Sequence, residues 1–184
     1  MIQKSTIIRH KVAYEMLTRL APLQPILIEN TEQYSTYRSQ MRGFIFDITQ
    51  GIKAYQLNAF TKSGLKLKPK SITWDHCYGR TRSMEKCIQD LVDKTIQNTD
   101  DFMNFVNKYG VQVGMSSEEN NEIAKFHKRT NQQYWDNPLY AYNELGFKFY
   151  TKSGVLISDD EMRMLLKYDD NIIYNNKTTN IWFE

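Results

Sequence analysis

The sequence predicts an α+β fold, in which short strands and the helix that follows them lie between largely helical segments. Two patterns support this prediction. Stretches such as SITWDH and VQVGM combine β-branched with aromatic or apolar residues, a composition typical of short strands. Stretches such as HKVAYEMLTRL and SMEKCIQDLVDK repeat apolar residues at the spacing of amphipathic helices. The 184 residues suffice for one domain with appendages or for two small domains.

The N-terminal part of the chain is expected to contain two helices followed by short strands. The first helix has an apolar face formed by Val12, Met16, Leu17 and Leu20. The second helix runs from about Thr31 through Arg42, and Gly43 ends it; one side carries Tyr34, Tyr37 and Met41. Alternating residues after this glycine predict short strands with turns near Gly51 and Ser63-Gly64.

Four further helices are expected in the rest of the chain. Residues 83–97 form the first of these, with inward side chains from Cys87, Ile88, Leu91 and Val92. The second is capped by Thr99 or Asp100 and ends at Gly110. Ser116 and Glu119 have the spacing of a capping box, so a third helix begins there and holds Asn120 and Asn121 in its first turn. The fourth begins at Ser158 or Asp159.

The cysteine content and the absence of long apolar stretches limit the class of protein. Cys77 and Cys87 are the only cysteines, too few for a disulfide framework or a four-cysteine zinc site. We interpret them as reduced thiols of a cytoplasmic protein. No stretch of the sequence approaches the roughly 18 apolar residues of a membrane span, and no signal peptide is visible. We therefore expect no membrane partner.

Positive charge is concentrated in the first part of the chain. Residues 1–74 contain 11 Lys and Arg against 4 Asp and Glu, a net charge of +7, although the whole chain carries only +3. No acidic residue lies between Asp47 and Asp75, whereas five lysines do: Lys53, Lys62, Lys66, Lys68 and Lys70. This run favours a polyanion partner. A solvated lysine-rich surface loop is the alternative.

Asp75 and His76 are the candidate catalytic pair, because phosphodiester hydrolysis needs an activated water and a cation near the scissile phosphate. A neutral imidazole can serve as the base, and oxygen ligands suit a hard divalent ion. Neighbouring residues of a strand point to opposite faces, so we expect a bend permitted by Gly79 to bring both side chains to one site. Asn120 or Asn121, at the start of a helix, is a suitable second ligand.

The strand with Asp-His, a connecting segment, a short strand and a helix opening with SSEENN together resemble the ββα-metal core of HNH endonucleases. More narrowly, they resemble the homing-type HNH enzymes of large tailed bacteriophages. The resemblance covers residues 69–130, into which Met84–Gly110 inserts helical material. It implies that His76 is the general base and that Asp75 and Asn120 bind Mg²⁺ (or Mn²⁺). It also implies the host cytoplasm as the location, if a bacteriophage encodes the chain.

Three further residues could act near this site. His127 lies seven residues after Asn120 and therefore shares its helix face, where it could complete the metal site, contact phosphate or simply pack. Arg80 and Arg82 follow the Asp-His pair closely, and arginine forks match phosphate oxygens bidentately. Ordinary salt bridges in an exposed loop are the alternative for these two arginines.

These observations divide the chain into three consecutive segments. Residues 1–68 are expected to be a basic DNA-binding segment, residues 69–130 an HNH-like nuclease core, and residues 131–184 an accessory segment that could contact DNA. The predicted function is a metal-dependent endonuclease of homing type, which hydrolyses phosphodiester bonds of double-stranded DNA at or near a recognised site. DNA contacts are assigned to Arg80, Arg82, Lys62, Lys66, Lys68 and Lys70. The alternative is a non-catalytic phage or plasmid DNA-binding protein.

Overall fold

The computed structural model describes residues 4–27, 31–47, 56–131, 133 and 137–166, and the chain divides into two compact units. The helical unit combines residues 1–53 with residues 80–107, and the sheet unit combines residues 54–79 with residues 108–184. Together they confirm the predicted mixed α+β class. Each unit draws on two separate stretches of chain, unlike the three consecutive segments expected from the sequence. The functions assigned to those segments stay predictions.

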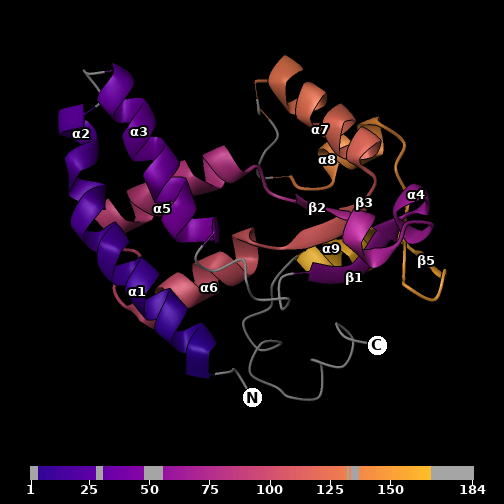
Figure 1. Ribbon diagram of the computed structural model, residues 1–184, viewed down its shortest axis with the longest axis horizontal. Coiled ribbons are helices and arrows are strands. Elements are labelled where there is room, and N and C mark those ends of the chain that lie inside the picture. Colours follow the sequence, from indigo (N-terminus) through magenta and orange to yellow (C-terminus); the bar gives the residue numbers. More distant parts are fainter. Residues whose placement is uncertain (1–3, 28–30, 48–55, 132, 134–136, 167–184) are drawn as a thin grey trace. The chain divides into compact units, whose positions relative to one another are not determined.

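The helical unit is built around apolar side chains that are almost inaccessible to solvent, among them Leu17, Met41, Phe46, Ile88 and Phe102. Its elements are helices and helical turns, and the α-helices are labelled in Figure 1. They are α1 (Lys4–Leu20), a 3-10 turn (Ala21–Leu23), α2 (Gln24–Leu27), α3 (Thr31–Arg42), a π-helical turn (Gly43–Asp47), α5 (Arg80–Val92) and most of α6 (Thr99–Tyr109). The predicted helix α3 is confirmed. Gly43 does not end the helical backbone, which continues as the π-helical turn.

Two predicted helices have the expected position but a different buried face. In α1, the predicted apolar face is only partly covered, because Leu17 is buried whereas Val12 is 49% and Met16 is 39% exposed. The buried face instead carries His10, whose ring lies edge-on to Phe102 of α6 at 6.2 Å. In α5, Cys87 and Ile88 are buried as predicted, whereas Val92 at the end of the helix is exposed. Helical spacing identifies an apolar stripe, but the packing partner decides which stripe is covered.

The sheet unit contains a five-stranded sheet in the order β2-β3-β1-β4-β5. Strands β1 and β3 are parallel, and all other neighbours are antiparallel. The strands are β1 (Gln56–Thr61), β2 (Thr73–His76), β3 (Gln112–Met115), β4 (Phe149–Tyr150) and β5 (Leu156–Ile157). The helices are α4 (Lys62–Leu65), a 3-10 turn (Pro69–Ser71), α7 (Ser117–Arg129), α8 (Tyr140–Glu144) and α9 (Asp159–Leu166). Both β2 and β3 were predicted from the sequence, and β2 is an edge strand.

Close backbone contact fixes the position of α4 against the sheet. A Cβ on Gly64 would lie 2.7 Å from the carbonyl oxygen of Gly114 and 2.8 Å from Cα of Met115, both in β3. Only glycine therefore lets α4 approach β3 this closely. Thr61 begins this helix, because its side-chain oxygen accepts a hydrogen bond from the Gly64 N–H at 3.0 Å.

Polar caps set the starts of three helices. The predicted capping box of α7 is confirmed, since Ser116 and Glu119 each accept a hydrogen bond from the other's backbone N–H. Glu119 also accepts a hydrogen bond from the Thr61 hydroxyl at 2.6 Å, which ties α7 to the end of β1. Ser158 and Glu161 make the same reciprocal pair at the start of α9. For α6 the cap is Asn98, whose side-chain oxygen accepts two backbone N–H bonds, rather than the predicted Thr99 or Asp100.

Candidate functional site

The structure places Asp75 and His76 on opposite faces of β2. All four residues of this strand pair with β3 in continuous antiparallel register, with Asp75 opposite Val113 and His76 opposite Gln112. Because successive side chains alternate between the faces of a sheet, the two side chains diverge. The predicted bend does not bring them to one site in this arrangement. The His76 ring contacts Gln112 across the strands, with 2.9 Å between the two Nε2 atoms.

Asp75 points toward the helices that pack against the sheet. The hydroxyl of Tyr142 in α8 donates a hydrogen bond to Asp75 Oδ2 over 2.5 Å. Helix α8 packs beside α7, and α7 packs against β2, as Figure 1 shows for this unit. Asp75 therefore lies on the face of β2 that is covered by α7 and α8.

Burial dominates the electrostatics around Asp75. It raises the pKa of this carboxyl to about 6, although hydrogen bonds from Tyr142 and from the His76 backbone N–H act in the opposite direction. Burial also raises the pKa of the neighbouring Cys77 thiol, and the Asp75 charge adds to that shift. The pKa of the buried Tyr142 hydroxyl lies well above its usual value for the same two reasons. Tyr142 and Cys77 are therefore uncharged near neutral pH.

Helix α7 carries the predicted second ligand. Asn120 lies in its first turn, is half-buried, and donates its backbone N–H to the Ser116 carbonyl at 3.1 Å. The neighbouring Asn121 is exposed. Of the two alternatives, Asn120 is therefore the one shielded by the rest of the sheet unit. Whether its amide oxygen binds metal stays a prediction.

His127 sits near the other end of α7. Its ring is half-buried and lies edge-on to Phe126 at 6.1 Å. Burial lowers the pKa of this imidazole, so it is uncharged at neutral pH. These contacts match the packing alternative. The two functional alternatives remain predictions.

Arg80 and Arg82 belong to the helical unit, on α5. Arg82 makes an ion pair with Glu85 at 2.8 Å, and the Arg80 guanidinium lies over the Phe46 ring, 5.4 Å from its centre. Both guanidinium groups therefore have partners within their own unit. Their assignment to DNA backbone contacts stays a prediction, and the salt-bridge alternative matches Arg82.

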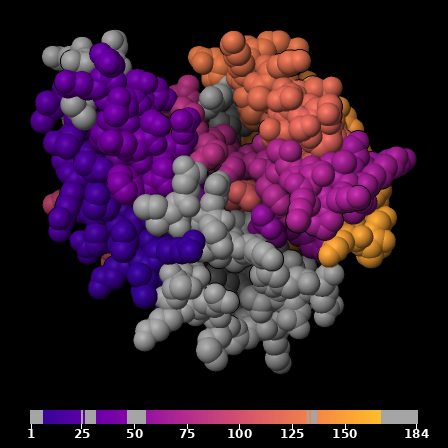
Figure 2. Space-filling view, in the orientation of Figure 1, coloured from indigo at the N-terminus to yellow at the C-terminus, as the bar shows by residue number. Residues whose placement is uncertain are grey.

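The four predicted DNA-contacting lysines of the sheet unit are all exposed: Lys62, Lys66, Lys68 and Lys70. They lie on α4 and on the segment that leads to β2, the purple-magenta surface in Figure 2. In the described part of the chain, none of them forms an ion pair with an acidic side chain. Their charges are therefore available to a polyanion, as they would also be in a solvated loop.

The donors assigned to a divalent metal fit it in kind. The Asp75 carboxylate and the Asn120 amide provide the oxygen ligands that Mg²⁺ and Mn²⁺ prefer. Tyr142 already donates to Asp75 Oδ2, so a metal would use Oδ1 or displace this hydroxyl. Within the described ranges, no three side chains of the His, Cys, Asp or Glu types gather as a metal site. The proposed pair of Asp75 and Asn120 contains only one side chain of these four types, so it does not count as such a group.

Sequence reasoning did not identify the direct partners of the candidate pair. Tyr142 lies 67 residues from Asp75, in an aromatic-rich stretch that gives no signal of a polar role. Gln112 had a detectable signal, because it is a polar residue in an otherwise apolar strand. Its burial to 6% exposure is accounted for by the contact with His76.

Comparisons with known proteins identify no relatives of this chain. No protein-family model matches it, and neither a curated protein nor a solved structure matches it. Of the helices that the structure describes, none combines the length and apolar character needed to cross a membrane.

Proposed function

We propose that this chain is a metal-dependent DNA endonuclease of the HNH type, with Asp75 and Asn120 as metal ligands and His76 as general base. The observation that carries the proposal is the succession of antiparallel β2 and β3 and then α7, with Asp75 directed toward the helical layer. This order and direction are what the resemblance to a ββα-metal core implies. The exposed lysines on the approach to β2 support a DNA partner.

The residues would divide the chemistry as follows. When bound, the divalent ion stabilises negative charge on the scissile phosphate and the leaving oxygen. The His76 imidazole accepts a proton from the attacking water at Nε2, which must first release the Gln112 amide group that donates to it. Because His76 lies on the opposite face of β2 from Asp75, DNA binding would have to turn one of these side chains toward the other. Catalytic groups often reach their working geometry only with substrate bound.

The test is a nicking assay on supercoiled plasmid with Mg²⁺ and with Mn²⁺, comparing the wild type with His76→Ala. We expect cleavage to fall about 10²- to 10⁴-fold, the usual cost of removing a positioned base, while DNA binding is nearly unchanged. Thr73→Ala, on the same strand, is the matched control. Cleavage by His76→Ala at the wild-type rate would show that His76 is not the general base.

A second candidate function, DNA binding without catalysis, is favoured by the partners of the candidate pair. Asp75 is held by Tyr142 and His76 by Gln112, so both side chains have structural roles in the sheet unit. Retention of DNA without cleavage in either metal would favour this candidate.

A further inference from the structure

A polar pocket of about 490 Å³ lies between α3 and α5, wholly within the helical unit. Its α3 wall is a strip of one helix face, and α5 contributes Thr81 and Met84. The strip consists of Tyr34, Ser35, Arg38, Ser39 and Arg42. The lining therefore offers two guanidinium groups and three aliphatic hydroxyls, and no acidic side chain. This donor set suits an anionic ligand.

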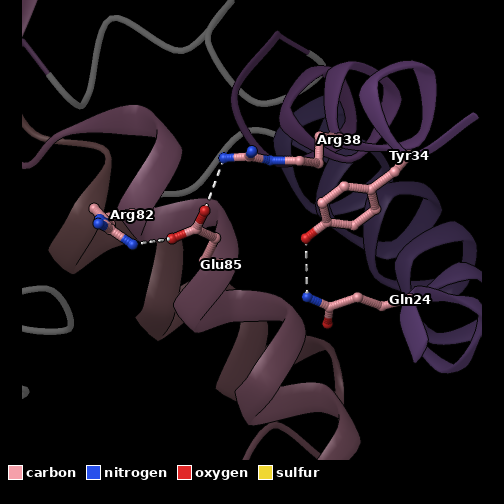
Figure 3. Close-up of polar contacts among 5 residues, drawn as sticks. All are labelled: Gln24, Tyr34, Arg38, Arg82 and Glu85. Atoms are coloured by element: carbon pink, nitrogen blue, oxygen red, sulfur yellow. Dashed lines mark hydrogen bonds and ion pairs between the residues drawn. The ribbon is translucent and has the colours of Figure 1, made fainter. Parts of the chain in front are cut away.

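One carboxylate holds two arginines in place beside the pocket. Glu85 of α5 accepts hydrogen bonds from Arg38 Nη2 at 2.7 Å and from Arg82 Nη1 at 2.8 Å, as Figure 3 shows. Arg38, Arg82 and Glu85 form a triad with two positive charges and one negative charge, so the triad is positive overall. The Arg38 guanidinium also lies 5.6 Å from the centre of the Tyr34 ring, which limits its movement. Arg38 is thus positioned before any ligand arrives.

Arg42 supplies a further positive charge at the same strip. It is exposed, and across the described ranges no acidic side chain forms an ion pair with it. An exposed guanidinium beside a positive triad is repelled by its neighbours and gains from a bound anion. Planar guanidinium forks recognise phosphate oxygens bidentately.

The dimensions of the strip favour a chain of phosphates over a single one. Ser35 and Arg42 are seven positions apart on α3, which is about 10 Å along the helix. That length matches about two successive phosphates of one DNA strand, which are farther apart than the axial rise of about 3.4 Å per nucleotide because the strand winds around the axis. Hydroxyl groups of Ser35 and Ser39 alternate with the arginines along it, and Thr81 of α5 adds a third hydroxyl to the pocket. Hydroxyl and guanidinium groups are both common donors to DNA phosphates.

We infer that the strip of α3 facing α5 binds the phosphate backbone of DNA, with Arg42 and Ser39 in direct contact with it. This inference rests on the proposed function for its partner, but not on catalysis. It adds a second contact surface to the lysines of the sheet unit. It also assigns DNA binding to α3 in particular, whereas the sequence predicted DNA binding only for the whole basic segment of residues 1–68.

The first experiment measures binding of a fluorescein-labelled DNA duplex by anisotropy, in EDTA, at several salt concentrations. Arg42→Ala should lower affinity and reduce the slope of log affinity against log salt by about 0.9, the value for one phosphate contact. Arg19→Ala is the matched control, because it removes an exposed arginine of the same unit from outside the strip. Equal effects of the two substitutions would overturn the inference.

The second experiment locates the DNA directly. Both native cysteines are buried, so Ser39→Cys introduces one exposed thiol on the strip and Gln40→Cys introduces one on the far side of the same helix. Bound duplex should slow maleimide labelling of the Ser39→Cys protein and leave that of the Gln40→Cys protein unchanged. Equal labelling of both in the presence of DNA contradicts the inference.

Further outcomes separate this inference from the proposed function. Normal nicking with no effect of Arg42→Ala would reject the α3 strip and leave the nuclease intact. Arg42-dependent DNA binding without nicking would support the strip and reject the nuclease. AMP or inorganic phosphate could fill the same pocket, so both are titrated alone. Arg42-dependent binding of either, without DNA binding, would overturn the inference in favour of a small phosphate ligand.

Discussion

The Tyr142 hydroxyl donates a hydrogen bond to Asp75 Oδ2 over 2.5 Å and so joins α8 to the edge strand β2. The Asp75 carboxylate is buried, and burial raises its pKa to about 6, although the hydrogen bond from Tyr142 acts in the opposite direction. Asp75 is therefore mostly protonated below that pH and mostly charged above it. The candidate metal ligand changes its charge close to neutral pH.

The first prediction concerns stability as a function of pH, measured in EDTA. Asp75 has a pKa of about 6 when folded, against 3.8 for an ordinary aspartate, so the folded state binds more protons between these values. Stability contributed by this group is fully present below pH 3.8 and is lost as pH rises through 6. The loss is at most about 3 kcal/mol.

Asp75→Asn removes this titration and keeps the size of the side chain. Relative to the wild type, its free energy of unfolding should rise between about pH 4 and about pH 7, by up to about 3 kcal/mol. Urea unfolding across this range measures it. As a companion, Tyr142→Phe removes a hydrogen bond that lowers the pKa, so it should move the titration to higher pH. Parallel pH profiles for the wild type and Asp75→Asn would contradict the assignment.

The second prediction concerns metal dependence. If Asp75 and Asn120 are the ligands, Asn120→Ala should shift the Mg²⁺ titration of plasmid nicking to higher concentration, because one oxygen ligand is lost. Asn121→Ala is a matched control, since this neighbour is exposed. If the Mg²⁺ titrations of the wild type and Asn120→Ala coincide, Asn120 is not a metal ligand.

Local signals explain which parts of the fold could be predicted from the sequence. The α7 capping box depends on two residues three positions apart, and both of its hydrogen bonds were readable from Ser116 and Glu119. Helix α3 was predicted by the same kind of local pattern. The buried face of α1 was not, because it depends on Phe102, a residue far along the chain that packs beside His10.

The same distinction applies to the candidate site. Asp75 and His76 were found as a dipeptide, but the bend expected to bring their side chains together was wrong, because all four residues of β2 keep regular pairing with β3. Their partners were beyond sequence reasoning, since Tyr142 and Gln112 reach them only through the folding of the sheet unit. Glu119 likewise has a second partner, Thr61, that its cap motif does not reveal.

The third prediction concerns the contact of α4 with the sheet. Gly64→Ala places a methyl group within 2.8 Å of two backbone atoms of β3, which cannot yield as a flexible side chain would. We expect a loss of about 1–3 kcal/mol in the free energy of unfolding, the usual cost of overpacking. Gly154→Ala is the comparison, because its Cβ would meet nothing within 4 Å and only its φ of +85° opposes the change. A Gly64→Ala protein as stable as the wild type would contradict the close approach of α4 to β3.

The last prediction concerns the lysines that precede β2. Lys62, Lys66, Lys68 and Lys70 are exposed, and each phosphate they neutralise should add about −0.9 to the slope of log affinity against log salt. Replacing all four with alanine should therefore lower DNA affinity and flatten the slope for any duplex sequence, because backbone contacts carry no base information.

Binding titrations at several salt concentrations measure this effect. Lys11, Lys94, Lys125 and Lys128 are exposed and lie outside the run, so a variant with these four replaced by alanine is a control of equal charge. A uniform electrostatic field would make the two variants alike, whereas a backbone-tracking surface makes the first far weaker. An unchanged slope in the first variant would mean that the run from Lys62 to Lys70 is a solvated loop.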